Sequence, residues 1–303
     1  MKKILCLVFL FCFIFTGCNN TNSNNNGNTD NKTDVEYVYF GKYPQSLASS
    51  EAVAHMSSTP NENGYYVSGY DNCEYLKTTG NQLESGYKFS NGETIIKTKI
   101  YYFKIEPIKW IVLGNDSNGN KLLLSDKVLW FGSFQTNYTN RNAEWYNTDI
   151  SGNIFANNWE HSDVRYWLNN SFINQAFSVS EQEALALASS FSNMEYAFED
   201  KVFFLSSTEI TSTQFGFSNE RFEDDMRIAL TSDYARASGA WISTNSKDYG
   251  ASLYYWLRSS TPQQSLFAEF VNNYGYIPGL GNDVGSKIGG YRPAIILEGD
   301  SSQ

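Results

Sequence analysis

Cysteine and histidine are scarce in this 303-residue chain, which has four of the first and two of the second. Three cysteines lie in the first 18 residues, so Cys73 stands alone in the rest of the chain. We therefore expect a fold that relies on packing rather than on internal disulfides. With only His55 and His161 as bases, and no G-x-S-x-G turn, serine-hydrolase chemistry has no support.

Positive charge is also in short supply, with 22 Lys and Arg against 32 Asp and Glu, a formal net charge of −10. An acidic chain is repelled by phosphate backbones and by anionic lipid surfaces. We therefore expect no nucleic-acid partner.

The apolar run at 4–15 follows Lys2 and Lys3 and precedes the small residues Thr16 and Gly17. It is shorter than the roughly 20 apolar residues that a membrane-spanning helix needs. A basic start, a short apolar run and small residues are typical of an export signal, which we place at 1–17. Its removal takes away Lys2 and Lys3, so the net charge moves from −10 to −12.

The junction Phe15-Thr16-Gly17-Cys18 resembles the lipobox of bacterial lipoproteins. In that family the leader is cut before the cysteine, whose sulfur is diacylated and whose new amine is acylated. The resemblance implies that Cys18 anchors the protein to a lipid bilayer outside the cytoplasm. Asn19, where an Asp would indicate inner-membrane retention, favours the outer membrane or cell surface. The alternative is an ordinary signal peptide with an incidental cysteine.

Residues 18–35 are expected to form the tether that follows the anchor. Eight of the fourteen residues at 19–32 are Asn, and none is large and apolar. Such a segment cannot bury enough surface to offset its ordering entropy. As a coil it would reach roughly 20–25 Å from the membrane.

The remainder, 36–299, is predicted to be one α+β domain with a probable insertion at 48–93. Alternating residues predict a first strand at 36–42 that turns at Pro44, and a strand pair around a turn at 116–119. Helical spacing begins at Ser162, and Ser178 with Glu181 has capping-box spacing. The apolar strand 293–298 is expected beside the first one, so that the two ends of the domain pair.

Five ordered motifs resemble a bacterial domain of unknown function found in exported and surface proteins: FGKYPQS, IKWIVL with NKLLLS, SDVRYWLNNSFINQAFS, KVFFLSSTE, and YYWLRSS closing with GGYRPAIIL. That domain is similar to the C-type-lectin-like superfamily, in the branch of the formylglycine-generating enzymes. The resemblance implies paired N- and C-terminal strands, two or more short helices in the middle, and long late loops that face a ligand. Those enzymes hold copper with two late cysteines, and no cysteine follows Cys73, so that chemistry is excluded.

The late loop between two predicted strands supplies the candidate ligand-binding residues. They are polar or aromatic side chains among several glycines: Asn272, Asn273, Tyr274, Tyr276, Asn282 and Asp283. Tyr and Asn offer stacking and adaptable hydrogen bonds. The alternative is a plain hairpin connection. We expect no cofactor, with calcium as the alternative, because oxygen ligands gather here.

Four residues in apolar surroundings are assigned structural roles: Trp167, Trp256, Arg258 and Arg292. An arginine in a strand core must be paired to be tolerated, with Glu209, Asp224 or Asp225 as partners. The alternative makes the two arginines binding forks for carboxylate or phosphate.

These observations predict a membrane-anchored, non-catalytic recognition domain whose target is a glycan or a protein. The alternative is a cell-envelope enzyme that acts on carbohydrate through a carboxylate pair.

Overall fold

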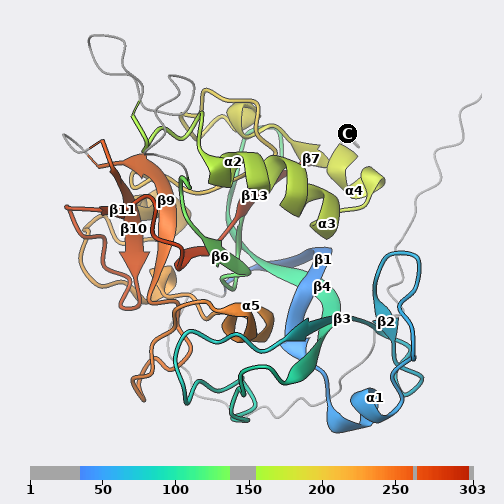
Figure 1. Cartoon of the computed structure of the whole chain (residues 1–303). Coiled ribbons are helices and arrows are strands. Elements are labelled where there is room, and N and C mark those ends of the chain that lie inside the picture. Colours follow the sequence, from blue (N-terminus) through green and yellow to red (C-terminus); the bar gives the residue numbers. More distant parts are fainter. Residues whose placement is uncertain (1–34, 137–154, 262–264, 300–303) are drawn as a thin grey trace, which may run out of the picture.

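Figure 1 shows the computed structural model, which describes residues 35–136, 155–261 and 265–299. The expected leader at 1–17, Cys18 and the tether up to Asp34 lie outside the described residues. Among the helices of the described ranges, none is both long and apolar enough to span a bilayer.

Two sheets form the framework, so the predicted α+β class is confirmed. The larger sheet is antiparallel, and the smaller one is antiparallel except where β9 pairs with β12. The larger sheet has eight strands in the order β2-β3-β4-β5-β13-β7, with β1 paired to β4 and β8 paired to β13. The smaller sheet has five strands in the order β11-β10-β9-β12-β6. The strands of the larger sheet are β1 (Tyr37–Leu47), β2 (Tyr66–Val67), β3 (Glu74–Thr79), β4 (Ile100–Asn115), β5 (Lys121–Ser125), β7 (Leu185–Ala186), β8 (Val202–Phe203) and β13 (Ala294–Leu297). Those of the smaller sheet are β6 (Trp130–Gly132), β9 (Tyr254–Ser260), β10 (Phe267–Asn272), β11 (Asn282–Asp283) and β12 (Gly289–Tyr291).

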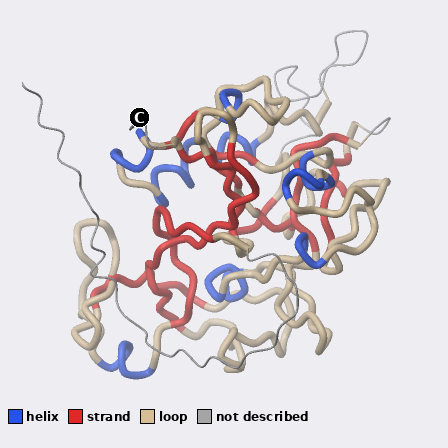
Figure 2. The backbone as a smooth tube through the Cα atoms, turned by 180° about the vertical axis from the view of Figure 1, so that it is seen from behind, coloured by secondary structure: helices blue, strands red, loops and turns tan. Residues whose placement is uncertain are grey.

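The helices are short and lie around the strands, as Figure 2 shows from behind. The start predicted at Ser162 is confirmed, because its side chain accepts a hydrogen bond from the Arg165 amide. The capping box of Ser178 and Glu181 is also present. The helices are α1 (Ser50–Ala54), α2 (Asp163–Trp167), the π-helical segment η2 (Leu168–Phe172), α3 (Ile173–Ala176), α4 (Val179–Glu183) and α5 (Asp233–Ser238). Short 3-10 turns follow at η3 (Ala188–Ser190), η4 (Glu209–Thr211), η5 (Thr213–Phe215) and η6 (Asp225–Arg227).

The first strand does not turn at Pro44, as the sequence predicted, but continues to Leu47. Its pairing with β4 shifts register between Tyr39 and Lys42 and again between Pro44 and Leu47. Proline lacks an amide donor and is tolerated at such irregular positions of an edge strand. A proline is therefore not a reliable stop signal here.

The expected pairing of the first and last strands is wrong. Tyr39 on β1 pairs with Lys109 on β4, whereas Ile295 on β13 pairs with Leu123 and Val202. Strands β4 and β5 separate β1 from β13 within one sheet. The two ends of the domain therefore share a sheet without pairing with each other.

The segment 48–93 is more regular than the expected insertion. It contains β2 and β3, and β3 extends the larger sheet by pairing with the first residues of β4. Tyr87 and Phe89 are fully buried beside β4 residues. Cys73 is buried near α1. No other cysteine lies in the described residues.

Candidate functional site

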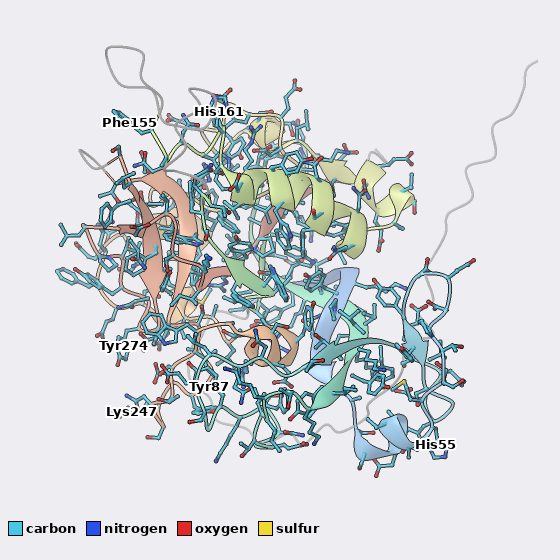
Figure 3. All side chains as sticks on the ribbon, in the orientation of Figure 1. His55, Tyr87, Phe155, His161, Lys247 and Tyr274 are labelled. Atoms are coloured by element: carbon cyan, nitrogen blue, oxygen red, sulfur yellow. The ribbon has the colours of Figure 1, made fainter. Side chains whose placement is uncertain are left out.

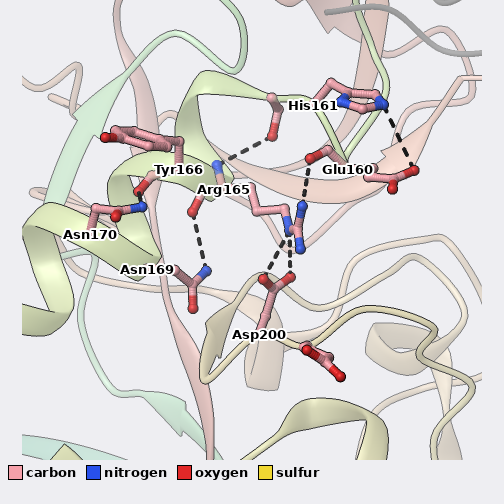
Figure 4. A pocket seen from close by; sticks show the side chains of 9 residues that line it. Glu160, His161, Arg165, Tyr166, Asn169, Asn170 and Asp200 are labelled. Carbon is pink, nitrogen blue, oxygen red and sulfur yellow. Dashed lines mark hydrogen bonds and ion pairs between the residues drawn. The ribbon is translucent and has the colours of Figure 1, made fainter. Parts of the chain in front are cut away.

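A pocket of about 420 Å³ lies beside the start of α2 (Figure 4). Its walls come from the turn before α2, from the outward side of α2 and η2, and from the loop before β8. The lining residues are Glu160, His161, Ser162, Arg165, Tyr166, Asn169, Asn170, Glu199 and Asp200. Residues 160–170 thus meet the loop at 199–200, about thirty residues further along the chain.

An ion pair joins these two walls. The Nε of Arg165 donates to both carboxylate oxygens of Asp200, at 2.9 and 2.8 Å, and its Nη1 donates to the Glu160 carbonyl at 2.6 Å. The Asp200 side chain is 3% exposed and that of Arg165 is 23% exposed. A charge-assisted hydrogen bond between such weakly exposed side chains is stronger than one on the open surface. It therefore holds the two walls of the pocket together.

A layer of aromatic side chains holds Asp200 from behind. The Tyr196 hydroxyl donates to Asp200 at 2.5 Å, and the Trp159 Nε1 donates to the Tyr196 oxygen at 2.8 Å. Burial, and then the neighbouring Asp200 charge, raises the pKa of Tyr196 well above its usual value. Tyr196 therefore stays a neutral donor, and the wall of the pocket keeps one arrangement of hydrogen bonds.

Several groups at the rim remain available to a ligand. Tyr166 is 68% exposed, and within the described residues neither its hydroxyl nor the Glu199 carboxylate makes a hydrogen bond. Among the described residues, the Glu160 carboxylate has one charged-group contact, with the His161 ring at 3.9 Å. The side-chain amide nitrogen of Asn170 donates to the Tyr166 carbonyl at 2.9 Å. The rim thus combines an aromatic face with carboxylate oxygens.

The late-loop residues predicted as a ligand site fall into two groups at opposite ends of β10. Asn282 and Asp283 form β11 and pair with Ala268 and Phe267 at the start of β10. Asn272 ends β10, four residues from Ala268, which is about 13 Å along a strand. The structure therefore does not bring the six predicted residues together.

The group around Asn272 forms a tight turn. Its Oδ1 accepts hydrogen bonds from the amides of Tyr274 at 2.9 Å and Tyr276 at 3.0 Å. Asn273 is buried and its side chain donates to Asp248 at 2.6 Å. Tyr274 is exposed, and the ring of Tyr276 stacks on Phe222, with centroids 6.5 Å apart. Asn272 and Asn273 thus shape the turn, while Tyr274 is exposed and Tyr276 is half-buried.

The residues assigned to structure lie in the core or at its edge. Arg258 makes a two-pronged ion pair with Glu209, one of the three partners that the sequence proposed. Arg292 is 1% exposed and donates to the carbonyls of Ser125 and Arg227 and to the Tyr255 hydroxyl. Its partners are therefore neutral oxygens rather than a carboxylate.

Both tryptophans pack inside. Trp256 is fully buried and donates from Nε1 to the Gly132 carbonyl at 2.9 Å. Trp167 is partly buried, with its ring 5.3 Å from that of Tyr291 and 5.5 Å from that of Phe172.

No group of three or more His, Cys, Asp or Glu side chains in the described part of the chain is arranged to hold a metal ion. Glu269, one of the late oxygen ligands, instead accepts from Arg221 at 2.6 Å.

Sequence reasoning missed the pocket and one exposed aromatic residue. The pocket depends on Arg165 meeting Asp200, a long-range contact with no local signal. Phe222 did carry a signal, because it is a lone aromatic residue within the charged run ERFEDDMR. An apolar ring in such a run is expected to be solvent-exposed.

Comparison with known proteins gives one match. No curated protein and no solved structure matches the chain. Residues 118–299 match the family described as a domain of unknown function, DUF6273, which covers more than half of the chain. The matched range begins in the turn between β4 and β5 and includes the pocket and the late loop. The chain therefore belongs to the DUF6273 family.

Proposed function

We propose that this protein is a lipid-anchored, extracytoplasmic recognition protein whose pocket beside α2 binds a glycan. The anchor is Cys18, and the tether lets the domain reach ligands beside the membrane. The proposal for the anchor is supported by the lipobox-like junction and the short apolar leader.

The pocket is the observation that carries the proposal. A sugar has apolar C–H faces that pack on an aromatic ring, and hydroxyl groups that donate to carboxylate and amide oxygens. Tyr166 supplies an exposed ring, while Glu160, Glu199 and Asn170 supply oxygens around it. The ion pair of Arg165 and Asp200 holds the pocket wall in one conformation before a ligand binds. Little conformational entropy of the protein is therefore lost on binding.

For the fold, we propose a relationship to the C-type-lectin-like superfamily. The support is the Trp-x-Arg-Ser motif at 256–259 and the Gly-x-Arg-Pro motif at 290–293, which lie on or beside neighbouring strands β9 and β12 of the smaller sheet. An experimental structure would test it, since a β-order unlike that of the superfamily would contradict the relationship.

A screen of the detergent-solubilised whole chain against oligosaccharides and cell-envelope glycans tests the function. We expect binding that Tyr166→Ala weakens by up to about tenfold, the value of one aromatic contact. Tyr39→Ala is the matched control, because Tyr39 is 59% exposed but lies on β1, outside the pocket lining. Equal loss in both variants, or no binding by the wild type, would contradict the proposal.

A second candidate function is glycan hydrolysis, because Glu160 and Glu199 line one pocket. Inverting and retaining glycosidases both act through two carboxyl groups. Both side chains here are exposed, whereas a general acid is usually placed in an apolar setting that keeps it protonated. Release of reducing sugar that Glu160→Gln or Glu199→Gln abolishes would favour the enzyme; glycan binding without turnover would favour recognition.

A further inference from the structure

Two loops that are hydrogen-bonded to each other expose large apolar side chains outside the pocket lining. Phe222 is 70% exposed, Tyr274 is 45% exposed and Leu280 is 72% exposed. The Tyr276 ring lies nearly parallel to that of Phe222, with an interplanar angle of 15°. We call Phe222, Tyr274, Tyr276 and Leu280 the aromatic surface. In Figure 3, His161 is labelled at the top of the molecule and Tyr274 at its lower left.

A single buried arginine holds both loops. Arg227 is fully buried, and its Nη1 donates to the carbonyls of Phe222 at 3.0 Å and Gly275 at 3.3 Å. Its Nη2 donates to the carbonyls of Ser218 and Glu220, and its Nε donates to that of Ile210. The exposed rings therefore project from a backbone that is fixed beneath them.

A backbone hydrogen bond and a close approach between Gly275 and Asp224 hold the two loops together. The Ile277 amide donates to the Arg221 carbonyl at 2.9 Å. Gly275 has a φ of +75°, and a Cβ there would lie 2.1 Å from the Asp224 carbonyl oxygen. Only glycine fits this approach. Exposed aromatic side chains on a prearranged backbone are typical of a binding surface.

Exposed acidic side chains gather beside Phe222, although Arg221 is itself 40% exposed and Lys247, next to the Asp248 that accepts from Asn273, is exposed. Glu220, Glu223 and Asp225 are exposed, and none of them forms an ion pair among the described residues. The two neighbouring arginines are occupied within the protein, because Arg221 pairs with Glu269 and Arg227 lies 3.4 Å from Asp224. A partner therefore meets aromatic faces flanked by three carboxylates.

We propose that the aromatic surface binds a cationic, arginine-bearing segment of a partner protein, independently of the glycan pocket. A guanidinium group stacks on aromatic faces and pairs with carboxylates, and it loses less hydration than an ammonium group. The acidic chain also steers a cationic partner toward it.

Fluorescence anisotropy of a labelled peptide of alternating arginine and glycine, titrated with the detergent-solubilised whole chain, tests the proposal. We expect binding that Phe222→Ala weakens about tenfold or more through loss of the cation–π contact. The triple variant Glu220→Gln, Glu223→Gln, Asp225→Asn should also weaken binding and reduce its salt dependence. A matching lysine–glycine peptide should bind more weakly.

The control variant removes the same number of exposed carboxylates elsewhere, as Glu62→Gln, Glu84→Gln and Glu183→Gln. It should bind the arginine peptide as the wild type does, and so should Tyr166→Ala, which alters only the glycan pocket. No peptide binding, or equal weakening by the two triple variants, would overturn the proposal. So would loss of glycan binding in Phe222→Ala without loss of peptide binding. An unchanged unfolding midpoint shows that each variant is folded.

Discussion

Arginine side chains replace missing sheet hydrogen bonds in the irregular part of this molecule. Arg227 alone donates to five backbone carbonyls, and Arg292 donates to two more. Buried carbonyls need partners, and a guanidinium offers five N–H donors in one plane. The long loops between β8 and β9 can therefore be buried without being strands.

Loss of the Arg258–Glu209 pair should be severe. Glu209→Ala would leave Arg258 with an unpaired charge whose side chain is only 9% exposed. We expect the free energy of unfolding, from urea titration, to fall by about 3–5 kcal/mol. Glu93→Ala is the control, because Glu93 and Lys99 are both about half exposed, and its effect should stay below about 1 kcal/mol. Similar small losses in both variants would contradict this view of the pair.

Stability should also fall at high pH because of buried tyrosines. Burial raises the pKa of Tyr254 to about 12 in the folded state. Because the folded state keeps the Tyr254 proton more tightly than the unfolded state does, the neutral hydroxyl contributes to the free energy of unfolding. This contribution is complete below pH 10, the usual pKa of an unfolded tyrosine, and is lost as the pH rises toward 12. The loss is about 2–3 kcal/mol for this one residue. Urea titrations between these pH values should show the fall, and Tyr254→Phe should make it shallower; an unchanged slope in that variant would count against the assignment.

At the scale of elements, a glycine in β1 lets the helix behind it approach. Gly41 has a φ of +65°, and a Cβ there would lie 2.5 Å from the Phe177 ring and 2.7 Å from the Ala176 carbonyl oxygen. It falls at the first register shift between β1 and β4. The irregularity of β1 thus makes room for the end of α3.

Gly41→Ala should lower the free energy of unfolding by about 1–3 kcal/mol more than Gly64→Ala, since overpacking adds to backbone strain. Gly64 is the matched control, because its φ is +82° and a Cβ there meets nothing within 4 Å. Chemical denaturation of both variants measures the difference, and equal losses would show that the contact with Phe177 does not matter.

Helices and strands that depend on short-range sequence patterns could be predicted, whereas the strands that pair with each other in the sheets could not. The start of α2 at Ser162, the box at Ser178, the hairpin of β4 and β5 and the strand β9 all depend on residues a few positions apart. The neighbours of β13 are β5, β7 and β8, which come from distant parts of the chain, and no local pattern encodes that choice. The glycan pocket was missed for the same reason, since Arg165 and Asp200 meet only after folding.

For the molecule as a whole, the pocket and the aromatic surface share no residue. A glycan bound beside α2 and a cationic partner bound at Phe222 would not compete for the same residues. Under the two proposals together, the anchored domain would hold a cationic partner beside an envelope glycan.

The anchor is tested by Cys18→Ser. We expect the variant to leave the membrane fraction and to lose labelling by a radioactive fatty acid, because acyl chains supply about 0.8 kcal/mol per buried CH₂. Cys73→Ser is the matched control and should keep both properties. Retention of the Cys18→Ser protein in membranes, with labelling intact, would contradict the lipoprotein proposal.

The most direct test of the recognition function is a crystal structure of the chain with the tightest glycan from the screen. We predict electron density for a sugar ring against the face of Tyr166, with its hydroxyl groups directed at Glu160 or Glu199. Density on another face of the molecule, with the pocket beside α2 unchanged at saturating ligand, would contradict it.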